Sequence, residues 1–414
     1  MENESKIKNI KITKKGNVIK FDYEMYGEWN KLLEKENKFW LEFEKNIENV
    51  PDSIAIIPLI VNILPISWAF DLEIDVDEID KTFYNCINNI KNGYERMYPS
   101  LKFKGSFKYN KIIENKINGE KCGTLFSGGV DATNTLIQNI KYKPDLITVW
   151  GSDIDLDDVK GWNIVKENHK KVANELELNF YTIKSNFRSF LNNDELNKFI
   201  YENIVGSWWH EMQHGIGLIG LVAPLSYING YNNVYIASSF TAKDIGKYTC
   251  ASDPTIDNEL KYADCITTHD GYEFNRQQKI ENICKYATKN NKKINLRVCW
   301  ESKGGKNCGH CEKCCRTMLG ILAEKADPND YGFEYNEEVG KNIKNIVKLK
   351  YKYNQYRAYL DIQNKFKENY SNEEIPDYLR WFRNVKIIDK KDIPNYVIFT
   401  QKVHNKIKRI LKIK

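Results

Sequence analysis

The stretch Gly123–Leu136, GTLFSGGVDATNTL, restricts the fold more than any other part of the chain. Its first four residues predict a short buried strand, Ser127-Gly128-Gly129 interrupts the extended pattern, and residues from Val130 onward have helical spacing. Two glycines let the backbone approach a bound group closely, and the free N–H groups and positive dipole end of the following helix face the same point. The stretch therefore predicts an anion-binding loop, for which phosphate is the usual occupant.

This loop differs from the common phosphate-binding P-loop. No Gly-Lys-Ser/Thr follows the glycines, so the loop supplies no lysine to hold a terminal phosphate. A bare Ser-Gly-Gly also occurs at ordinary strand-to-helix turns, and that structural alternative stays open on this stretch alone.

Around the loop, strands alternate with helices, which predicts an α/β fold built on a doubly wound parallel sheet. We expect strands at Thr124–Phe126, Leu146–Trp150, Asn179–Ile183 and Val234–Ser238. We expect helices near Asp131–Ile140, Asp157–Leu176, Asp194–Phe199 and Trp208–Leu225. Ligands of such sheets bind at the carboxyl ends of the strands, so Ser127 and the polar turn Gly151-Ser152-Asp153 are expected to line a nucleotide pocket.

Four cysteines form the second strong motif. Two cysteines separated by two residues hold one metal from a tight turn, and Cys308, Cys311 and Cys314 have this spacing. Cys299 can return as the fourth ligand across a Gly-Gly loop, and four thiolates would close the coordination of a structural Zn²⁺. An iron–sulfur cluster, a redox pair, free thiols and His310 as a substitute ligand are alternatives, but the spacing favours zinc. The scattered cysteines have ordinary burial as their default interpretation; they are Cys86, Cys122, Cys250, Cys265 and Cys284.

A Ser-Gly-Gly-Val-Asp loop followed roughly 170 residues later by Cys-x8-Cys-x2-Cys-x2-Cys-x-Arg resembles one family over residues 120–325. It is similar to the 7-cyano-7-deazaguanine synthases of queuosine biosynthesis, in the PP-loop ATP pyrophosphatase (adenine nucleotide alpha hydrolase-like, HUP-like) superfamily. The resemblance implies a ligase that uses ATP and Mg²⁺ to adenylate a carboxylate, 7-carboxy-7-deazaguanine or a similar deazapurine, with release of pyrophosphate. Ammonia or an amine would then replace AMP, giving an amide, a nitrile or a conjugate, and the four cysteines would bind structural Zn²⁺.

By position, the resemblance implies a nucleotide site whose loop residues surround the pyrophosphate, with Ser127 and Asp131 in catalytic roles and Asp131 helping to position Mg²⁺. The implied loop contacts are Ser127, Gly128, Gly129, Val130, Asp131, Ala132 and Thr133. Gly151 and Asp153 would lie near adenine or ribose. Arg276 and Lys279 resemble a basic helix start that faces phosphate or a substrate carboxylate, and a solvated helical pair is the alternative.

The chain departs from the family pattern in three respects. Ala132 stands where the loop usually has a serine, with Thr133 one place later, and Arg316 follows the cysteines one residue early. The family's simple members are also little more than the central domain, whereas this chain has additional regions on both sides. This architecture resembles divergent relatives in bacterial anti-phage defence gene clusters and suggests a different acyl acceptor, which could be a protein.

We expect four regions: an α+β domain at 1–118, the PP-loop domain at 119–298, a zinc segment at 299–332 and a helical basic region at 333–414. The last of these ends in Lys402–Lys414, where a solvated terminal helix is favoured over a nucleic-acid or membrane contact. Within the first region we expect a hairpin of Lys8–Thr13 and Asn17–Tyr23, helices at Glu34–Asn49 and Asp77–Tyr98, and strands at Ile54–Ile63 and Leu101–Phe107.

Composition sets few further limits. The net charge of +6 comes from 62 Lys and Arg against 56 Asp and Glu, an excess that permits an anionic ligand without requiring nucleic acid. No signal peptide is evident, and the apolar stretch Ser53–Phe70 is interrupted by Pro58, Asn62 and Pro65, which favours a buried strand and turn over a membrane span. We therefore expect a cytoplasmic protein with no membrane partner, and we expect a homodimer.

Two other function classes stay open. A PP-loop tRNA-modifying enzyme would need a second exposed Cys-x-x-Cys, which the sequence lacks, and a catalytically silent, zinc-stabilised nucleotide-binding module would fit Ala132 in the loop. His210 and His214 are four residues apart on an expected helix, a spacing that could hold a metal. The stretch His210-Glu211-Met212-Gln213-His214 has the form His-Glu-x-x-His, but a packing or capping role is favoured for both histidines.

Overall fold

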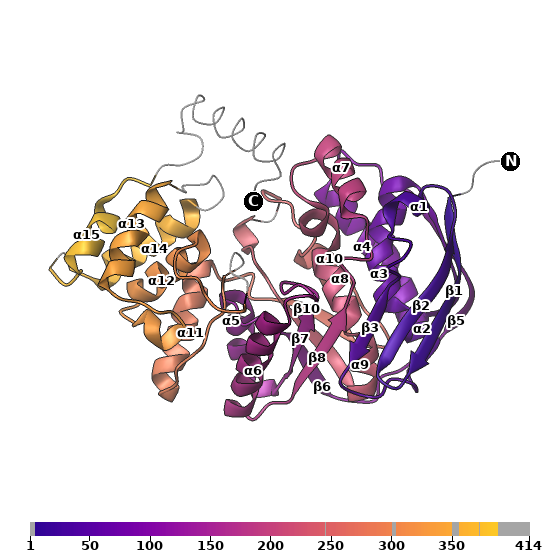
Figure 1. Cartoon of the computed structure of the whole chain (residues 1–414), viewed down its shortest axis with the longest axis horizontal. Coiled ribbons are helices and arrows are strands. Elements are labelled where there is room, and N and C mark those ends of the chain that lie inside the picture. The colour runs from indigo at the N-terminus through magenta and orange to yellow at the C-terminus, as the bar shows by residue number, and fades with distance from the viewer. Residues whose placement is uncertain (1–4, 245, 300–303, 350–355, 372, 388–414) are drawn as a thin grey trace. The chain divides into compact units, whose positions relative to one another are not determined.

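The computed structural model describes residues 5–244, 246–299, 304–349, 356–371 and 373–387 (Figure 1). By internal contacts the chain divides into two compact units, Met1–Lys306 and Asn307–Lys414. The expected terminal helix over Lys402–Lys414 lies outside the described residues.

A mostly parallel sheet, ten-stranded in the described part, forms the centre of the first unit, in the order β10-β9-β6-β7-β8-β3-β2-β1-β4-β5. The chain therefore has the α/β class that the strand–helix alternation predicts. The strands are β1 Lys6–Lys15, β2 Val18–Met25, β3 Trp40–Phe43, β4 Glu73–Asp80, β5 Ser106–Ile113, β6 Lys121–Leu125, β7 Asp145–Trp150, β8 Phe180–Ser185, β9 Tyr231–Ala237 and β10 Ile266–Asp270.

The half of the sheet that positions the site consists of β6 to β10, all of whose neighbouring pairs are parallel. β6 lies between β7 and β9, because the chain moves from β6 outward to β7 and β8 and later returns on the other side with β9 and β10. The direction of winding thus reverses at β6, and the carboxyl end of β6 is the topological switch point. The sequence did not predict β10, whose residues Ile-Thr-Thr-His-Asp are mostly polar.

The other half of the sheet comes from the start of the chain. β1 and β2 form the expected antiparallel hairpin, and β3 pairs with β2 and, antiparallel, with β8 through Leu41 and Ser185. The sheet therefore runs across residue 118, where the sequence suggests a domain boundary. The helix expected at Glu34–Asn49 is wrong, since Trp40–Phe43 is a strand whose Leu41 and Phe43 are buried.

The strand expected at Ile54–Ile63 is also wrong. This segment forms the helices α2 Asp52–Ala55 and α3 Ile57–Phe70, with Pro58 in the first turn and Pro65 inside α3. Nearly every side chain of α3 is buried, so the segment has no polar face and no helical periodicity that sequence reasoning could detect. The helix expected at Asp77–Tyr98 begins only at Lys81, because β4 continues to Asp80, whose carboxylate accepts a hydrogen bond from the Phe83 N–H (2.9 Å).

Helices fill the connections between the central strands (Figure 1). The helix expected at Trp208–Leu225 is divided into a π-helical turn at Trp209–Gln213, α8 His214–Leu221 and α9 Ala223–Asn229, with Pro224 at the start of α9. None of the described helices is long and apolar enough to cross a membrane. The remaining helices of this unit are α1 Trp29–Leu32, α4 Lys81–Met97, α5 Val130–Asn139, α6 Val159–Glu175, α7 Asn193–Asn203, α8 His214–Leu221, α9 Ala223–Asn229, α10 Pro254–Asp257 and α11 Arg276–Asn290, with 3₁₀ turns at Ile140–Tyr142 and Ala242–Asp244.

The described part of the second unit is helical. It contains α12 Glu312–Ala323, a 3₁₀ turn at Pro328–Tyr331, α13 Glu337–Leu349, α14 Tyr356–Asn369 and α15 Asp377–Asn384. α12 packs against α13 and α14, and α15 packs against α13 and α14. Phe366 and Phe382 contact each other in this small core, and the Tyr359 hydroxyl donates to Glu312 of α12 (2.8 Å).

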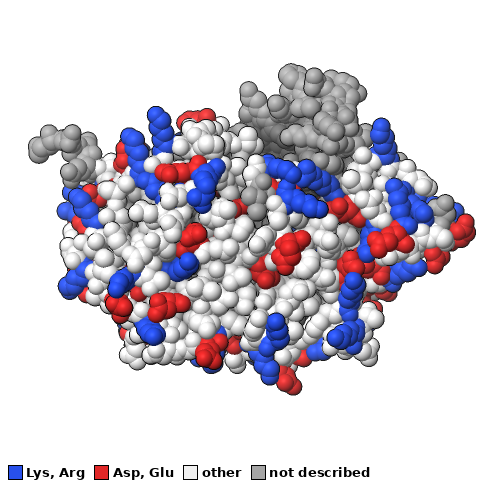
Figure 2. All heavy atoms as spheres, turned by 180° about the vertical axis from the view of Figure 1, so that it is seen from behind, with Lys and Arg blue, Asp and Glu red and all other residues white. Residues whose placement is uncertain are grey.

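Charged side chains do not mark out one ligand surface on the face drawn in Figure 2. Among the described residues of that face, Lys and Arg are interspersed with Asp and Glu. A mixed surface of this kind gives no support to a nucleic-acid partner, for which basic side chains would gather along one face.

Candidate functional site

The loop Ser127–Gly129 leaves β6 at the switch point and leads directly into α5. Gly128 has a φ of +73°, in the left-handed region, and Gly129 is the N-cap residue of α5 with extended backbone. No side chain caps this helix among the described residues, and the Gly129 N–H lies 3.4 Å from the Ser127 hydroxyl oxygen. The first turn of α5 therefore presents uncapped N–H groups at the carboxyl end of the sheet, as an anion-binding loop requires.

His169 of α6 explains why position 128 is a glycine. A Cβ atom at Gly128 would lie 2.6 Å from His169 Nε2. The Thr148 hydroxyl donates to the Phe126 carbonyl (2.8 Å), so its oxygen must accept from His169 Nδ1 (2.8 Å). Nε2 is then an unprotonated acceptor, and it is buried without a partner among the described residues. Burial and the nearby Arg297 guanidinium lower the pKa of His169 to about 3, so this imidazole is neutral.

Two cations from the start of α11 contact Asp131 in the first turn of α5. Arg276 Nη1 lies 3.1 Å from Oδ2 of Asp131, and Lys279 Nζ lies 3.1 Å from Oδ1. Lys279 also donates to the Ser238 carbonyl at the end of β9, and its side chain is only 2% exposed. The alternative of a solvated helical pair is therefore wrong for Lys279, which joins α5, α11 and β9 beside the loop.

Arg297 is a third cation at the loop, and sequence reasoning missed it. Its backbone N–H donates to the Gly128 carbonyl (2.8 Å), and its Cβ would lie 3.6 Å from a Cβ placed on Gly128. Its Nε is buried and has no hydrogen-bond partner in the described part of the chain. No spacing rule indicates that the segment before Cys299 returns to a loop some 170 residues earlier, so only the tertiary structure could reveal this residue.

The turn Gly151-Ser152-Asp153 follows β7, the neighbour of β6, and so lies at the same edge of the sheet as Ser127. Gly151 has a φ of +103°, and a Cβ there would lie 2.0 Å from the Ser185 carbonyl oxygen. Arg188 Nη1 donates to the Ser152 carbonyl (2.8 Å) and holds this turn against β8. These contacts fix the position of the turn at the same edge of the sheet as the loop.

Three of the residues that follow Gly129 pack in the interior of the protein. Val130, Ala132 and Thr133 are all buried, and the Ala132 methyl belongs to an apolar cluster with Phe126 and Leu136. Since Ala132 faces this cluster, its methyl group contributes to packing between the loop and the sheet.

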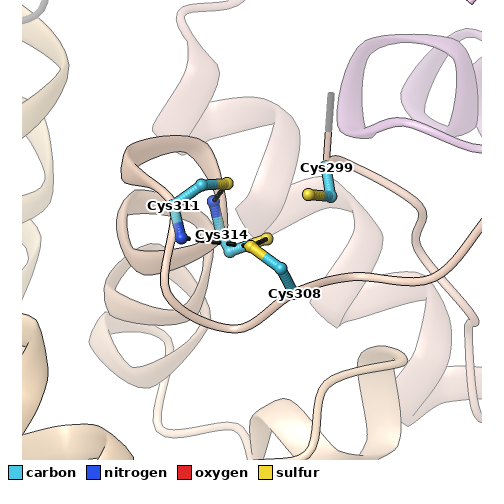
Figure 3. A group of neighbouring side chains, drawn as sticks. All are labelled: Cys299, Cys308, Cys311 and Cys314. Atoms are coloured by element: carbon cyan, nitrogen blue, oxygen red, sulfur yellow. Dashed lines mark hydrogen bonds between the residues drawn. The ribbon is translucent and has the colours of Figure 1, made fainter. Parts of the chain in front are cut away.

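The structure brings together the four cysteines that the spacing selects. The Sγ atoms of Cys299, Cys308, Cys311 and Cys314 all lie within 4.8 Å of one another (Figure 3). Cys308 and Cys314 are 4.0 Å apart at sulfur, close to the ~3.8 Å expected between two thiolates on a tetrahedral Zn²⁺. Backbone N–H groups of Cys311 and Cys314 point at the sulfurs of Cys308 (3.2 Å) and Cys311 (3.4 Å). Four converging, largely buried sulfurs can hold a metal ion such as Zn²⁺.

Two neighbouring residues are not part of this group. The Cys315 thiol points at the Gly309 carbonyl (3.7 Å), and His310 is exposed with its Nδ1 at the Cys308 carbonyl (2.7 Å). The group that could hold a metal therefore consists of the four predicted cysteines, without the substitute ligand.

Comparison of the sequence with models of known protein families finds no match, and comparison with individual characterised proteins also finds none.

Proposed function

We propose that this protein binds ATP at the Ser127–Gly129 loop and transfers AMP to a carboxylate, releasing pyrophosphate. The observation that carries the proposal is a glycine loop at the switch point of a parallel sheet, with Arg276, Lys279 and Arg297 around it. Basic side chains and an uncapped helix start suit the triphosphate of a nucleotide. The lack of a P-loop lysine favours reaction at the α-phosphate over transfer of the terminal phosphate.

Adenylation solves a chemical problem for amide formation. A carboxylate is a poor acyl donor because its leaving group would be oxide, whereas an acyl-adenylate loses AMP. The protein would position the carboxylate in line with the α-phosphorus and neutralise the charge that develops on pyrophosphate. Loop N–H groups and the cations Lys279 and Arg297 are the groups that would do so here.

The residues present fit an ATP-bound Mg²⁺ in one respect. Asp131 is the acidic residue of the loop, its side chain is 23% exposed, and Arg276 and Lys279 keep it fixed at the anion site. Mg²⁺ bound there would supply further neutralisation of the phosphates. Zn²⁺ in the four-cysteine site would have a structural role, because four thiolates leave no open position for a substrate.

The finer parts of the proposal rest on the family resemblance. The carboxylate would be 7-carboxy-7-deazaguanine or a similar deazapurine, and the acceptor of the acyl group would be ammonia or an amine, including one on a protein. A cytoplasmic homodimer acting in anti-phage defence belongs to the same proposal.

A direct test incubates the protein with ATP, Mg²⁺ and 7-carboxy-7-deazaguanine, with and without ammonia, and identifies the products by mass spectrometry. We expect AMP and pyrophosphate to form only when the carboxylate is present. Release of ADP and phosphate would contradict the proposal. Tight ATP binding with no turnover for any deazapurine carboxylate would favour a silent nucleotide-binding module.

A further inference from the structure

A second group of reactive side chains lies in a pocket at the carboxyl ends of β9 and β10. Ser238, Cys250 and His269 line this pocket, and Ser238 follows β9 directly. The Ser238 carbonyl holds Lys279, whose ammonium group holds Asp131 of the loop. Lys279 therefore connects a lining residue of the pocket to the first turn of the helix that follows the loop.

Within this pocket, Cys250 lies between two imidazoles. Its Sγ is 3.9 Å from Nδ1 of His210 and 3.9 Å from Nδ1 of His214, distances that allow a thiol hydrogen bond to nitrogen. Other buried cysteines differ, because the thiols of Cys86, Cys122 and Cys265 face backbone carbonyls. A carbonyl oxygen can only accept a hydrogen bond from a thiol, whereas a neutral imidazole nitrogen can also act as a base and take the thiol proton.

The geometry indicates which tautomer the neutral His210 ring adopts. Its Nε2 lies 3.1 Å from the Thr249 carbonyl oxygen, which can only accept, so Nε2 carries the hydrogen. In that neutral tautomer Nδ1 is the nitrogen without a hydrogen, and it is the atom directed at the Cys250 thiol. A nucleophile, a base and a third group that orients the base form the arrangement that activates cysteine in enzymes.

The same atoms do not suit a metal. In the described part of the chain, the four-cysteine group is the one set of at least three His, Cys, Asp or Glu ligand atoms that converge closely enough to hold an ion. Burial raises the pKa of the Cys250 thiol to about 12, so the thiol stays protonated at rest and needs a base during attack. His210, with 43% of its side chain exposed, is open to an incoming substrate.

We propose that Cys250 receives the acyl group from the acyl-adenylate and holds it as a thioester, with His210 as the base. This inference rests on the proposed adenylation. Sγ attacks the acyl carbon, the bond from that carbon to the phosphate oxygen breaks, and AMP leaves with the electron pair, while the thiol proton moves to His210 Nδ1. Ammonia or an amine then forms the C–N bond, the C–S bond breaks, the thiolate recovers a proton from His210, and the proton that the nitrogen loses passes to water.

A thioester on Cys250 would give the enzyme a practical advantage. It would keep the activated acyl group on the protein after AMP has left, so a bulky amine acceptor need not enter while the nucleotide occupies the loop. The acceptor class consistent with this site is a primary amine.

The test uses the full-length protein with ATP, Mg²⁺ and 7-carboxy-7-deazaguanine, without any amine. After an acid quench, we expect the intact mass to rise by the mass of the carboxylic acid less one water, and hydroxylamine to remove the added mass. Peptide mapping of the wild-type protein should place the adduct on Cys250. The C250A variant should show no adduct and should form product at least about 100-fold more slowly, whereas C265A, at another buried cysteine, should behave like wild type.

Two further measurements distinguish failure of the thioester proposal from failure of the proposed adenylation. The H210N variant should form the adduct at least about 10-fold more slowly at an unchanged melting temperature. ATP–pyrophosphate exchange reports adenylation by itself. Exchange without any thioester in the wild-type protein, or full product formation by C250A, would overturn the inference and leave the proposed function standing. Absence of exchange would overturn the proposed function, and this inference with it.

Discussion

Gly128 is the residue on which the anion-binding loop depends most directly. Its backbone has a φ of +73°, and His169 fills the space where a side chain would begin. The positive φ and the lack of room for a Cβ atom both favour glycine at this position. Without a side chain there, the loop N–H groups can reach a bound anion directly.

A Gly128→Ala substitution should therefore weaken ATP binding by at least about 10-fold, because the new Cβ would lie 2.6 Å from His169 Nε2 in a strained backbone conformation. Gly129→Ala is the matched control, since a Cβ there would meet nothing closer than 3.5 Å. Isothermal titration calorimetry with ATP measures both variants. Equal affinities for the two would contradict the role assigned to Gly128.

His169 should make stability depend on pH. Its pKa is about 3 in the folded protein and close to the ordinary 6.5 when unfolded. The unfolded state therefore binds the proton more readily, so the contribution to stability is complete above pH 6.5 and is lost as the pH falls from there toward 3. Between about pH 6.5 and pH 5 the free energy of unfolding should fall by about 2 kcal/mol from this residue. Urea unfolding at several pH values measures it, and the slope should decrease in a His169→Gln variant; an unchanged slope would show that His169 is not buried neutral.

At the scale of elements, α11 connects the first turn of α5 to the end of β9, the strand next to β6. It begins at Arg276, its capping box fixes its first turn, and its cations Arg276 and Lys279 reach Asp131 on α5. Sequence reasoning could identify this helix start as basic, but it could not decide whether the two cations faced solvent or the loop.

Replacing Lys279 by Met should lower the affinity for ATP by roughly 10-fold or more, because it removes a buried cation beside the phosphate site. The control is Lys285→Met on the same helix, because the Lys285 side chain is 71% exposed and pairs with Glu281. The two variants can be compared by nucleotide titration at a fixed salt concentration. Equal losses would indicate that Lys279 acts only through the general charge of the protein.

At the scale of the whole molecule, the four-cysteine group is the set of side chains in the described residues that could hold a metal ion. Cys299 is nine residues before Cys308 in the sequence, and the intervening chain includes residues outside the described part. Convergence of all four sulfurs to within 4.8 Å is the expected result of binding one ion.

The purified protein should accordingly contain about one Zn²⁺ per chain by elemental analysis. A Cys311→Ser variant should lose that metal and melt roughly 5 °C or more below the wild-type protein, because metal binding contributes to folding free energy. Cys315→Ala is the matched control, since Cys315 lies outside the group and should leave the zinc content unchanged. Zinc lost equally from both variants would contradict the assigned ligand set.

The sequence by itself determined the local features whose physical cause is local. Glycines that interrupt a strand before a helix predicted the loop, alternation predicted the β1–β2 hairpin, and the spacing of Cys308, Cys311 and Cys314 predicted the metal group. Prediction from the sequence failed for the helix Ile57–Phe70, which is buried on nearly all sides and therefore has no amphipathic periodicity. It also failed for the short strand Trp40–Phe43, which is stabilised by pairing with β2 and β8.

The tertiary structure alone decided which distant residues meet. Arg297 beside Gly128, Lys279 beneath Asp131, and His210 against Cys250 all depend on how strands far apart in the chain are ordered within one sheet. Local propensity and spacing carry no information on that order, because strand neighbours are chosen by burial and pairing across the whole sheet. The loop could thus be predicted from its own residues, whereas the fold places the cations and the cysteine of the proposed site.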